Sequence, residues 1–220
     1  MAWTNDPNGG LSAVPANGGT GFQSWTSSEQ GDITAGFYFL ANSTANGFGD
    51  VNSSNSRAFG MFASGTGNTV NSYRKMILGL MVGGSFTVRF ATQFRNGNKG
   101  VVILKGGTPV FNFDVGGPNQ YRYSTTYTGS VFTSFTNTDW IYSGTSVFTL
   151  SVHRPTVGVC TFTVLRDADG TDTTPRSTGP ISINTNTDVD ELQLYTSQTE
   201  VGSPNNLYFN FLSAYNAYPA

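Results

Sequence analysis

The sequence has few charged residues and no long apolar run. Asp, Glu, Lys and Arg make up 11% of the 220 residues, and the net charge is −2, whereas an average soluble protein has about 25% charged residues. Such a chain offers no basic surface for phosphates, which argues against a nucleic-acid partner and against an anionic membrane surface. The longest apolar stretch, 76–82, is far shorter than the roughly 20 residues of a membrane-spanning helix.

Cysteine and histidine occur once each, which limits the available chemistry. Cys160 cannot form an intramolecular disulfide, and a cysteine-based metal site would need partners. Hydrolytic schemes that use histidine would depend on His153 alone, and no Gly-x-Ser-x-Gly motif accompanies it. The chain begins without a basic and apolar leader. Because low-charge β domains rich in Asn, Ser, Thr and Gly are usually exported, we expect an extracellular protein whose leader has been removed.

The sequence does contain many segments in which apolar and polar residues alternate. In 85–94, Phe86, Val88 and Phe90 alternate with Thr87, Arg89 and other non-aromatic residues, which indicates a half-buried strand. The same pattern recurs at 111–114, 148–153, 192–195 and 207–211, and further strands are expected at 35–40, 57–63, 120–124 and 159–166. About a dozen short strands at this spacing predict an all-β fold, a two-sheet antiparallel β-sandwich. No change of composition divides the chain, so residues 1–220 are expected to form one domain.

One tight connection is also predicted. Asn, Gly and Lys at 96–100 separate the strand at 85–94 from the apolar segment at 101–104. Glycine supplies the positive φ that short turns need. The sequence therefore predicts a β-hairpin between these two segments.

The order of several segments resembles a known group of domains. Their sequences are GFQSWT at 21–26, GFYFLANST at 36–44, SRAFGMFA at 56–63, VGGSFTV at 82–88 and NLYFNFL at 206–212. Together they are similar to concanavalin A-like jelly-roll domains of the carbohydrate-binding-module or lectin-like kind, found in exported bacterial proteins. The resemblance implies a module that binds sugars and is fused to, or acts beside, a polysaccharide-degrading enzyme. It implies no particular binding residue.

Outward-facing polar residues supply the candidate ligand-binding site. Side chains alternate strictly between the two faces of a sheet, so the polar positions of four strands are expected to share one outer surface, with two aromatic residues near its rim. The alternative is the ordinary polar outer face that every sandwich shows. The predicted set is Arg89, Gln93, His153, Gln193, Tyr208 and Asn210, with Trp140 and Tyr142 at the rim.

Two acidic clusters have two interpretations each. Asp167, Asp169 and Asp172 could hold a structural calcium ion, because hard cations prefer clustered oxygen ligands. The competing interpretation is a turn, since Asp-Gly after a strand is common in hairpins and the further ligands of an EF-hand are missing. The segment 188–191 leaves the same two alternatives open. No other cofactor is expected.

These observations favour a non-catalytic carbohydrate-binding module for a neutral polysaccharide, a β-glucan or a related glycan. The alternative is a structural or adhesive exoprotein domain without a sugar ligand. A glycoside hydrolase is a third interpretation. It is disfavoured because hydrolases need two carboxylates across the scissile bond, and Glu191 and Glu200 are too far apart in sequence to share one short strand.

Overall fold

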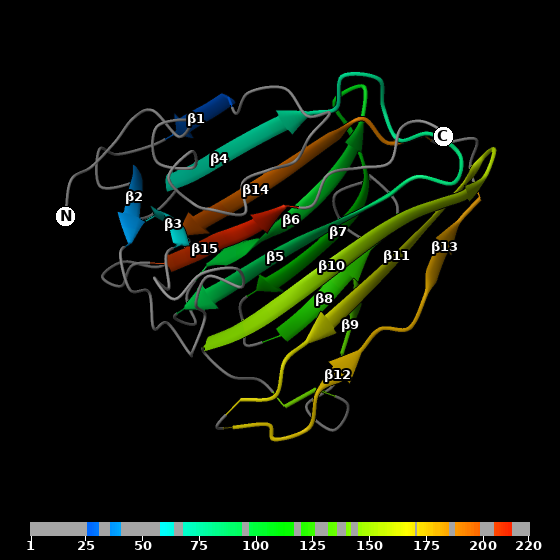
Figure 1. Ribbon diagram of the computed structural model, residues 1–220. Coiled ribbons are helices and arrows are strands. Elements are labelled where there is room, and N and C mark those ends of the chain that lie inside the picture. The colour runs from blue at the N-terminus through cyan, green and yellow to red at the C-terminus, as the bar shows by residue number, and fades with distance from the viewer. Residues whose placement is uncertain are drawn as a thin grey trace.

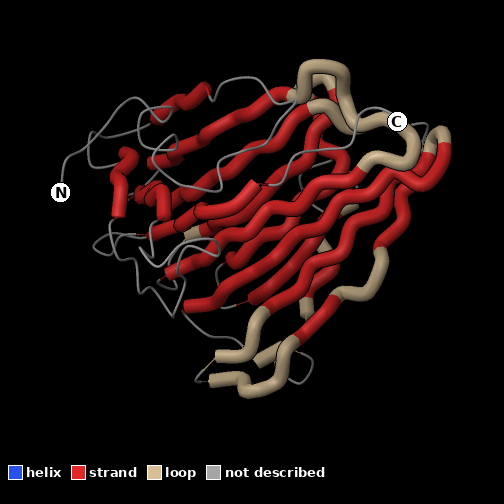
Figure 2. The backbone as a smooth tube through the Cα atoms, viewed as in Figure 1, coloured by secondary structure: helices blue, strands red, loops and turns tan. Residues whose placement is uncertain are grey.

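The computed structural model describes residues 26–30, 36–40, 58–63, 68–93, 97–116, 120–125, 132–135, 140–141, 145–169, 171–184, 188–198 and 205–212. Within these ranges every regular element is a strand (Figure 2), and no helix suited to crossing a membrane was found. All strand pairs are antiparallel. The predicted all-β, two-sheet antiparallel fold is confirmed.

The strands form two sheets that lie one behind the other in Figure 1. The seven-stranded sheet has the order β1 (Thr26–Gln30), β4 (Asn68–Lys75), β14 (Glu191–Gln198), β6 (Asn98–Lys105), β7 (Thr108–Gly116), β8 (Gln120–Ser124) and β9 (Thr133–Ser134). The eight-stranded sheet has the order β12 (Arg176–Ser177), β11 (Val159–Arg166), β10 (Thr145–Thr156), β5 (Ser85–Gln93), β15 (Asn205–Leu212), β3 (Ala58–Ala63) and β2 (Gly36–Leu40), with β13 (Ile181–Ile183) beside β11.

Aromatic rings from both sheets fill the space between them. Phe111 of β7 stacks on Phe162 of β11 with ring centroids 4.5 Å apart. Phe148 of β10 lies 5.1 Å from Phe113 of β7 and 5.2 Å from Phe90 of β5. All five rings are fully buried. Because successive side chains point to opposite faces of a sheet, each of these rings places its polar neighbours on an outer surface.

The predicted hairpin at 96–100 is wrong. Gly97 has the positive φ that was expected, 68°, but β5 belongs to the eight-stranded sheet and β6 to the seven-stranded one. Both edges of β5 are already paired, with β10 on one side and β15 on the other. The segment after β5 therefore connects the two sheets instead of returning beside β5.

One ionisable side chain lies among the core-facing positions of β6. Lys99 is fully buried and occupies the same face of the strand as Val101 and Ile103. Burial lowers the pKa of Lys99 to about 7, while the negative charge of Asp114 opposes this shift. A lysine ammonium is costly to desolvate, so the folded chain favours its neutral form.

We predict that this lysine makes stability rise with pH just above neutrality. The pKa of Lys99 is about 7 in the folded chain and has its ordinary value of 10.5 when unfolded, so between these values the unfolded chain binds more protons. The free energy of unfolding should therefore increase by up to about 1.4 kcal/mol per pH unit. Denaturant titrations from pH 7 to 8.5 measure this slope.

Lys99→Met is the matched variant, because methionine keeps an unbranched apolar side chain and carries no proton. The slope attributed to Lys99 should be absent in this variant. The range ends at pH 8.5 because burial raises the pKa of Cys160 to about 11, which lowers stability once the unfolded thiol ionises. Equal slopes in both proteins would contradict the assignment.

Candidate functional site

Cross-strand register aligns polar side chains on the outer face of the seven-stranded sheet. Leu192 and Leu194 point into the core, so the residues between and beside them point outward. Strand pairing extends these positions across five strands in two adjacent rows. The first row is Tyr73, Gln193, Val102, Asn112 and Ser124, and the second is Asn71, Tyr195, Gly100, Asp114 and Arg122.

All of the first row, together with Tyr195, Asp114 and Arg122 of the second, forms the floor of a groove with a volume of about 670 Å³. This volume lies within the roughly 300–1,000 Å³ that is typical of small-molecule sites. Both apolar and polar groups contribute to its walls. The lining residues are Tyr73, Asn98, Val102, Leu104, Gly107, Pro109, Val110, Phe111, Asn112, Asp114, Arg122, Ser124, Phe132, Glu191, Gln193 and Tyr195.

A buried carboxylate organises one end of this groove. Asp114 is 1% exposed and accepts two hydrogen bonds from Arg122, at 2.6 Å from Nε and 3.0 Å from Nη2. The hydroxyl of Tyr195 donates a third bond to Asp114 at 2.8 Å. Such bidentate, charge-assisted pairs are among the stronger hydrogen bonds in proteins. The ring of Phe132 also lies 4.2 Å from the Arg122 guanidinium, which is a cation–π contact.

The same contacts fix the protonation of these groups. The hydrogen bonds that Arg122 donates to Asp114 raise the pKa of Arg122 above its ordinary value, although burial opposes the shift. Burial, followed by the charge of Asp114, raises the pKa of Tyr195 well above its ordinary value. Tyr195 therefore remains a neutral hydroxyl donor, and Arg122 remains a cation that already has a carboxylate partner.

The hydroxyl group of Tyr195 can reach the carboxylate of Asp114 because a glycine lies between the two residues. Gly100 lies between these two residues in the row, so β6 places no side chain there. A Cβ atom at Gly100 would lie 2.1 Å from the carbonyl oxygen of Phe113, which is far inside van der Waals contact. The tyrosine thus crosses β6 at the position where the strand has no side chain.

Gln193 and Glu191 line the groove beyond the cluster around Asp114. Gln193 donates a hydrogen bond from Nε2 to Oδ1 of Asn71 at 2.8 Å, which fixes its orientation. Glu191 is 6% exposed and stands opposite Lys75 in the register. Burial raises the pKa of Glu191, Lys75 opposes this shift and Asp190 adds to it.

The expectation that the predicted ligand-binding residues share one surface is wrong. Arg89 belongs to β5 of the eight-stranded sheet, whereas Gln193 belongs to β14 of the seven-stranded sheet. The alternation of apolar and polar residues predicts which face of its strand each residue occupies. It does not predict which of the two sheets contains that strand. Among the predicted residues whose side chains the structure describes, only Gln193 lines the groove.

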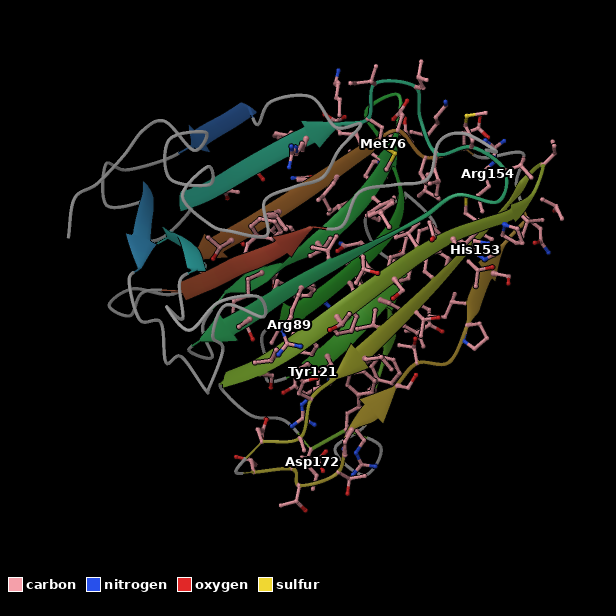
Figure 3. The ribbon with its side chains drawn as sticks, viewed as in Figure 1. Met76, Arg89, Tyr121, His153, Arg154 and Asp172 are labelled. Atoms are coloured by element: carbon pink, nitrogen blue, oxygen red, sulfur yellow. The ribbon has the colours of Figure 1, made fainter. Side chains whose placement is uncertain are left out.

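The other predicted residues that belong to strands are all in the eight-stranded sheet; they are Arg89, Gln93, His153, Tyr208 and Asn210. Arg89 forms an ion pair with Asp167 at 2.9 Å, and His153 is exposed. Both lie on one face of the eight-stranded sheet, but His153 is four residues beyond the residue paired with Arg89, about 13 Å along the strand. Figure 3 shows this separation. The side chains of Gln93, Tyr142, Tyr208 and Asn210 are outside the described part of the structure.

Register also limits what alternation predicts for β15. Its pairing with β5 shifts between Phe209 and Phe211, so the extra residue at this bulge is Asn210. A bulge inverts the phase of alternation beyond it. The sequence pattern could therefore not be carried through this strand.

The predicted aromatic residue at the rim is in the core instead. Trp140 is 4% exposed and stacks on Phe135 with ring centroids 4.5 Å apart. It also contacts Tyr121 and Phe113 at centroid distances of 5.7 and 6.2 Å. The polar residues before Trp140 suggested an exposed loop, but the aromatic cluster buries the indole ring. Among the described residues, the aromatic side chains that line the groove are Tyr73, Phe132 and Tyr195, since the ring of Phe111 lies in the core.

The aspartates proposed for calcium are paired with arginines. Arg166 donates to Asp169 and to Asp172, both at 2.7 Å, and Arg176 donates to Asp172 at 2.9 and 3.2 Å. These bonds, chiefly the one from Arg176, hold the pKa of Asp172 well below its ordinary value. Guanidinium groups engage the oxygens that a metal would need, so this donor set does not fit a calcium ion.

The aspartates of the second acidic segment, 188–191, also make ion pairs and hydrogen bonds. Asp188 pairs with Arg154, and Asp190 accepts hydrogen bonds from the backbone of Gly106 at 3.0 and 3.1 Å. In the described ranges no group of three or more His, Cys, Asp or Glu side chains is arranged to hold a metal ion. Of the two interpretations given for these clusters, the contacts of the described residues favour the turn, and chelation can test this against calcium binding.

The positions of the groove carboxylates bear on the hydrolase interpretation. Asp114 and Glu191 are on strands separated by β6, and their partners on β6 are Gly100 and Leu104, four residues apart. Strand spacing and rise then separate the carboxylates by roughly 16 Å. Glycosidase pairs are about 5–9.5 Å apart, so these two do not form such a pair.

No family model and no curated protein matches the sequence. Among solved structures, the chain is similar to one described as "Prominent members of the human gut microbiota express endo-acting O-glycanases to initiate mucin breakdown", with a TM-score of 0.49, 16% identity and coverage of 86% of this chain and 94% of the other. It is also similar to the Crh5 transglycosylase, with a TM-score of 0.46, 11% identity and coverage of 86% and 87%. A sialidase matches with a TM-score of 0.45 and 10% identity, over 71% of this chain and 15% of its own.

We predict that Gly100→Ala destabilises the protein by about 1–3 kcal/mol, because the new methyl group collides with backbone that cannot move freely. Gly116→Ala is the matched control on β7, since its Cβ would meet only side-chain atoms of Asn98 and Arg122, at 3.0 and 3.1 Å. Chemical denaturation measures both variants. A loss for Gly116→Ala that equals or exceeds that for Gly100→Ala would argue against the backbone clash.

We also predict that Arg166→Met lowers the free energy of unfolding by about 1–3 kcal/mol, because Asp169 loses its arginine partner and the buried Asp172 keeps only Arg176. EDTA should leave the melting temperature of the unmodified protein unchanged. A decrease on chelation that calcium reverses would instead show that an ion stabilises the fold.

Proposed function

We propose that this chain is a non-catalytic carbohydrate-binding module, and that a neutral polysaccharide, a β-glucan or a related glycan, binds in the groove on the outer face of the seven-stranded sheet. The observation that carries the proposal is the alignment of Gln193, Asn112 and Tyr195 on the floor of this groove. Amide and hydroxyl groups can both donate to and accept from sugar hydroxyls.

Preorganisation supports this proposal. The bond from Gln193 to Asn71 and the bonds around Asp114 fix these side chains before any ligand arrives. A site whose polar groups are already ordered loses less conformational entropy on binding. Phe132 and Tyr73 add apolar ring surface to the groove walls, against which the C–H faces of a sugar ring can pack.

The cellular context belongs to the same proposal. The module acts outside the cell, where polysaccharides are found, and is fused to or works beside an enzyme that degrades them. The low charge of the chain fits a neutral polymer, for which long-range electrostatic attraction has no role.

A structural or adhesive role without a sugar ligand is the second candidate. One observation favours it: Ile77, Leu78 and Val82 are 60, 56 and 47% exposed, and Val157 is 77% exposed. The backbone of Gly83 donates to the carbonyl of Arg154 at 2.7 Å, so the segment 76–84 and the turn after β10 lie at the same end of the sandwich. Exposed apolar side chains that gather in this way can mark a contact surface.

Affinity electrophoresis tests the proposal against this alternative. The gel panel contains mixed-linkage β-glucan, xyloglucan and galactomannan, and we expect at least one polymer to retard the protein. Gln193→Ala should weaken that binding by about tenfold, the equivalent of one hydrogen bond of ~1.4 kcal/mol. Unchanged mobility of the unmodified protein in every gel would contradict the proposal.

His153→Ala is the matched control, because His153 is exposed on the other sheet. We expect this variant to bind like the unmodified protein. If His153→Ala weakened binding and Gln193→Ala did not, the ligand would occupy the eight-stranded sheet instead of the groove.

A further inference from the structure

Glu191 differs from the other charged side chains of the groove. Within the described lining, these are Asp114, Arg122 and Glu191. Asp114 and Arg122 neutralise each other through their two hydrogen bonds. Glu191 as a whole residue is more than nine-tenths buried, and no hydrogen bond or ion pair joins its carboxylate to another described residue. Its oxygens are not among the completely buried side-chain atoms of the described residues that lack a partner, so the little exposure that Glu191 has is available to its carboxylate in the groove. It therefore contributes a negative charge that no direct partner balances.

Its neighbours locate this carboxylate in the groove. In the register Glu191 stands between Lys75 on β4 and Leu104 on β6, and Leu104 also lines the groove. The charge of Glu191 raises the pKa of Tyr73, another lining residue, after the larger effect of burial. Lys75 is exposed and acts on Glu191 only through its field.

Burial of a carboxylate without hydrogen-bond donors is unfavourable. A ligand that supplies donors to this position would satisfy both oxygens at once, since an ionised carboxylate is an acceptor only. Neighbouring hydroxyls of a sugar ring are suitable donors. A ligand carboxylate or sulfate would instead place a second negative charge beside the first, and like charges at short range in a partly buried site repel strongly.

We infer that Glu191 is the specificity-determining residue of the groove: its carboxylate accepts hydrogen bonds from sugar hydroxyls and rejects anionic glycans such as uronate-containing or sulfated polymers. This inference rests on the proposed carbohydrate-binding function and adds to it the charge class that the site selects. Selection by repulsion of the wrong ligand is a common route to specificity.

The experiment compares one neutral polymer with its own anionic derivative. The probes are mixed-linkage β-glucan and the same β-glucan after partial carboxymethylation, or the equivalent pair made from whichever panel polymer binds. For the unmodified protein we expect at least tenfold weaker binding of the carboxymethylated form. Glu191→Gln should bind the neutral polymer about three- to tenfold more weakly and the carboxymethylated polymer more strongly, so that the ratio of the two affinities approaches one.

Asp167→Asn is the matched control for net charge. It removes one negative charge from a half-exposed aspartate that pairs with Arg89 on the other sheet, and the affinity ratio should not change. Glu191→Gln should fold normally, because glutamine has the same shape and no charge to bury. Melting temperatures of all three proteins confirm that comparable folded states are measured.

The outcomes separate this inference from the proposed function. If Gln193→Ala weakens binding but Glu191→Gln leaves the affinity ratio unchanged, the groove binds glycans and the inference about Glu191 is overturned. If no neutral polymer binds the unmodified protein, the proposed function itself fails.

A pH titration with the neutral polymer provides a second readout. Burial raises the pKa of Glu191, so its carboxylate takes up a proton above the usual range for glutamate as the pH falls. The charged groups around it are Lys75 from β4 and Asp190, itself near Lys105, on the same chain segment; Tyr73 of β4 is titratable but neutral in this range, because its pKa is raised. Affinity should decrease toward low pH in the unmodified protein and should depend less on pH in Glu191→Gln; equal profiles would count against the inference.

Discussion

The aromatic core between the two sheets is the constraint on which the rest of the structure depends. Phe111 and Phe113 of β7 contact Phe162 and Phe148 of the opposite sheet. Once these rings point inward, strict alternation leaves Asp114 and its polar neighbours no position except the outer face. The groove is therefore a consequence of core packing, and a one-residue slip of β7 would exchange the two surfaces.

Ion pairs between buried groups organise the molecule away from this core. Asp114 holds Arg122 and Tyr195 at the groove, while Arg166 holds Asp169 and Asp172 near one end of the eight-stranded sheet. Figure 3 places Asp172 at the end of the molecule opposite to Arg154. With only 11% charged residues, much of the chain's charge is committed to such pairs. This commitment makes the unpaired carboxylate of Glu191 unusual.

The two outer surfaces of the sandwich differ in character. The seven-stranded sheet has a groove whose polar side chains are fixed by one another. On the eight-stranded sheet, Arg89 forms an ion pair with Asp167. His153 is exposed and lies far from Arg89 along the strand direction. A preorganised groove favours ligand binding on the first surface, whereas isolated polar residues on the second mainly maintain solubility.

The sequence alone determined the all-β class, the strands at 120–124 and 159–166, and the outward orientation of Arg89, His153 and Gln193, because alternation is a local property of an extended chain. The same alternation marked Asn112 and Asp114 as outward, although it could not single them out. Only the tertiary structure decided which strands share a sheet, that Trp140 is buried, and that the aspartates at 169 and 172 pair with arginines. These outcomes depend on pairing between segments distant in sequence, and a local pattern carries no information about which distant segment becomes its neighbour.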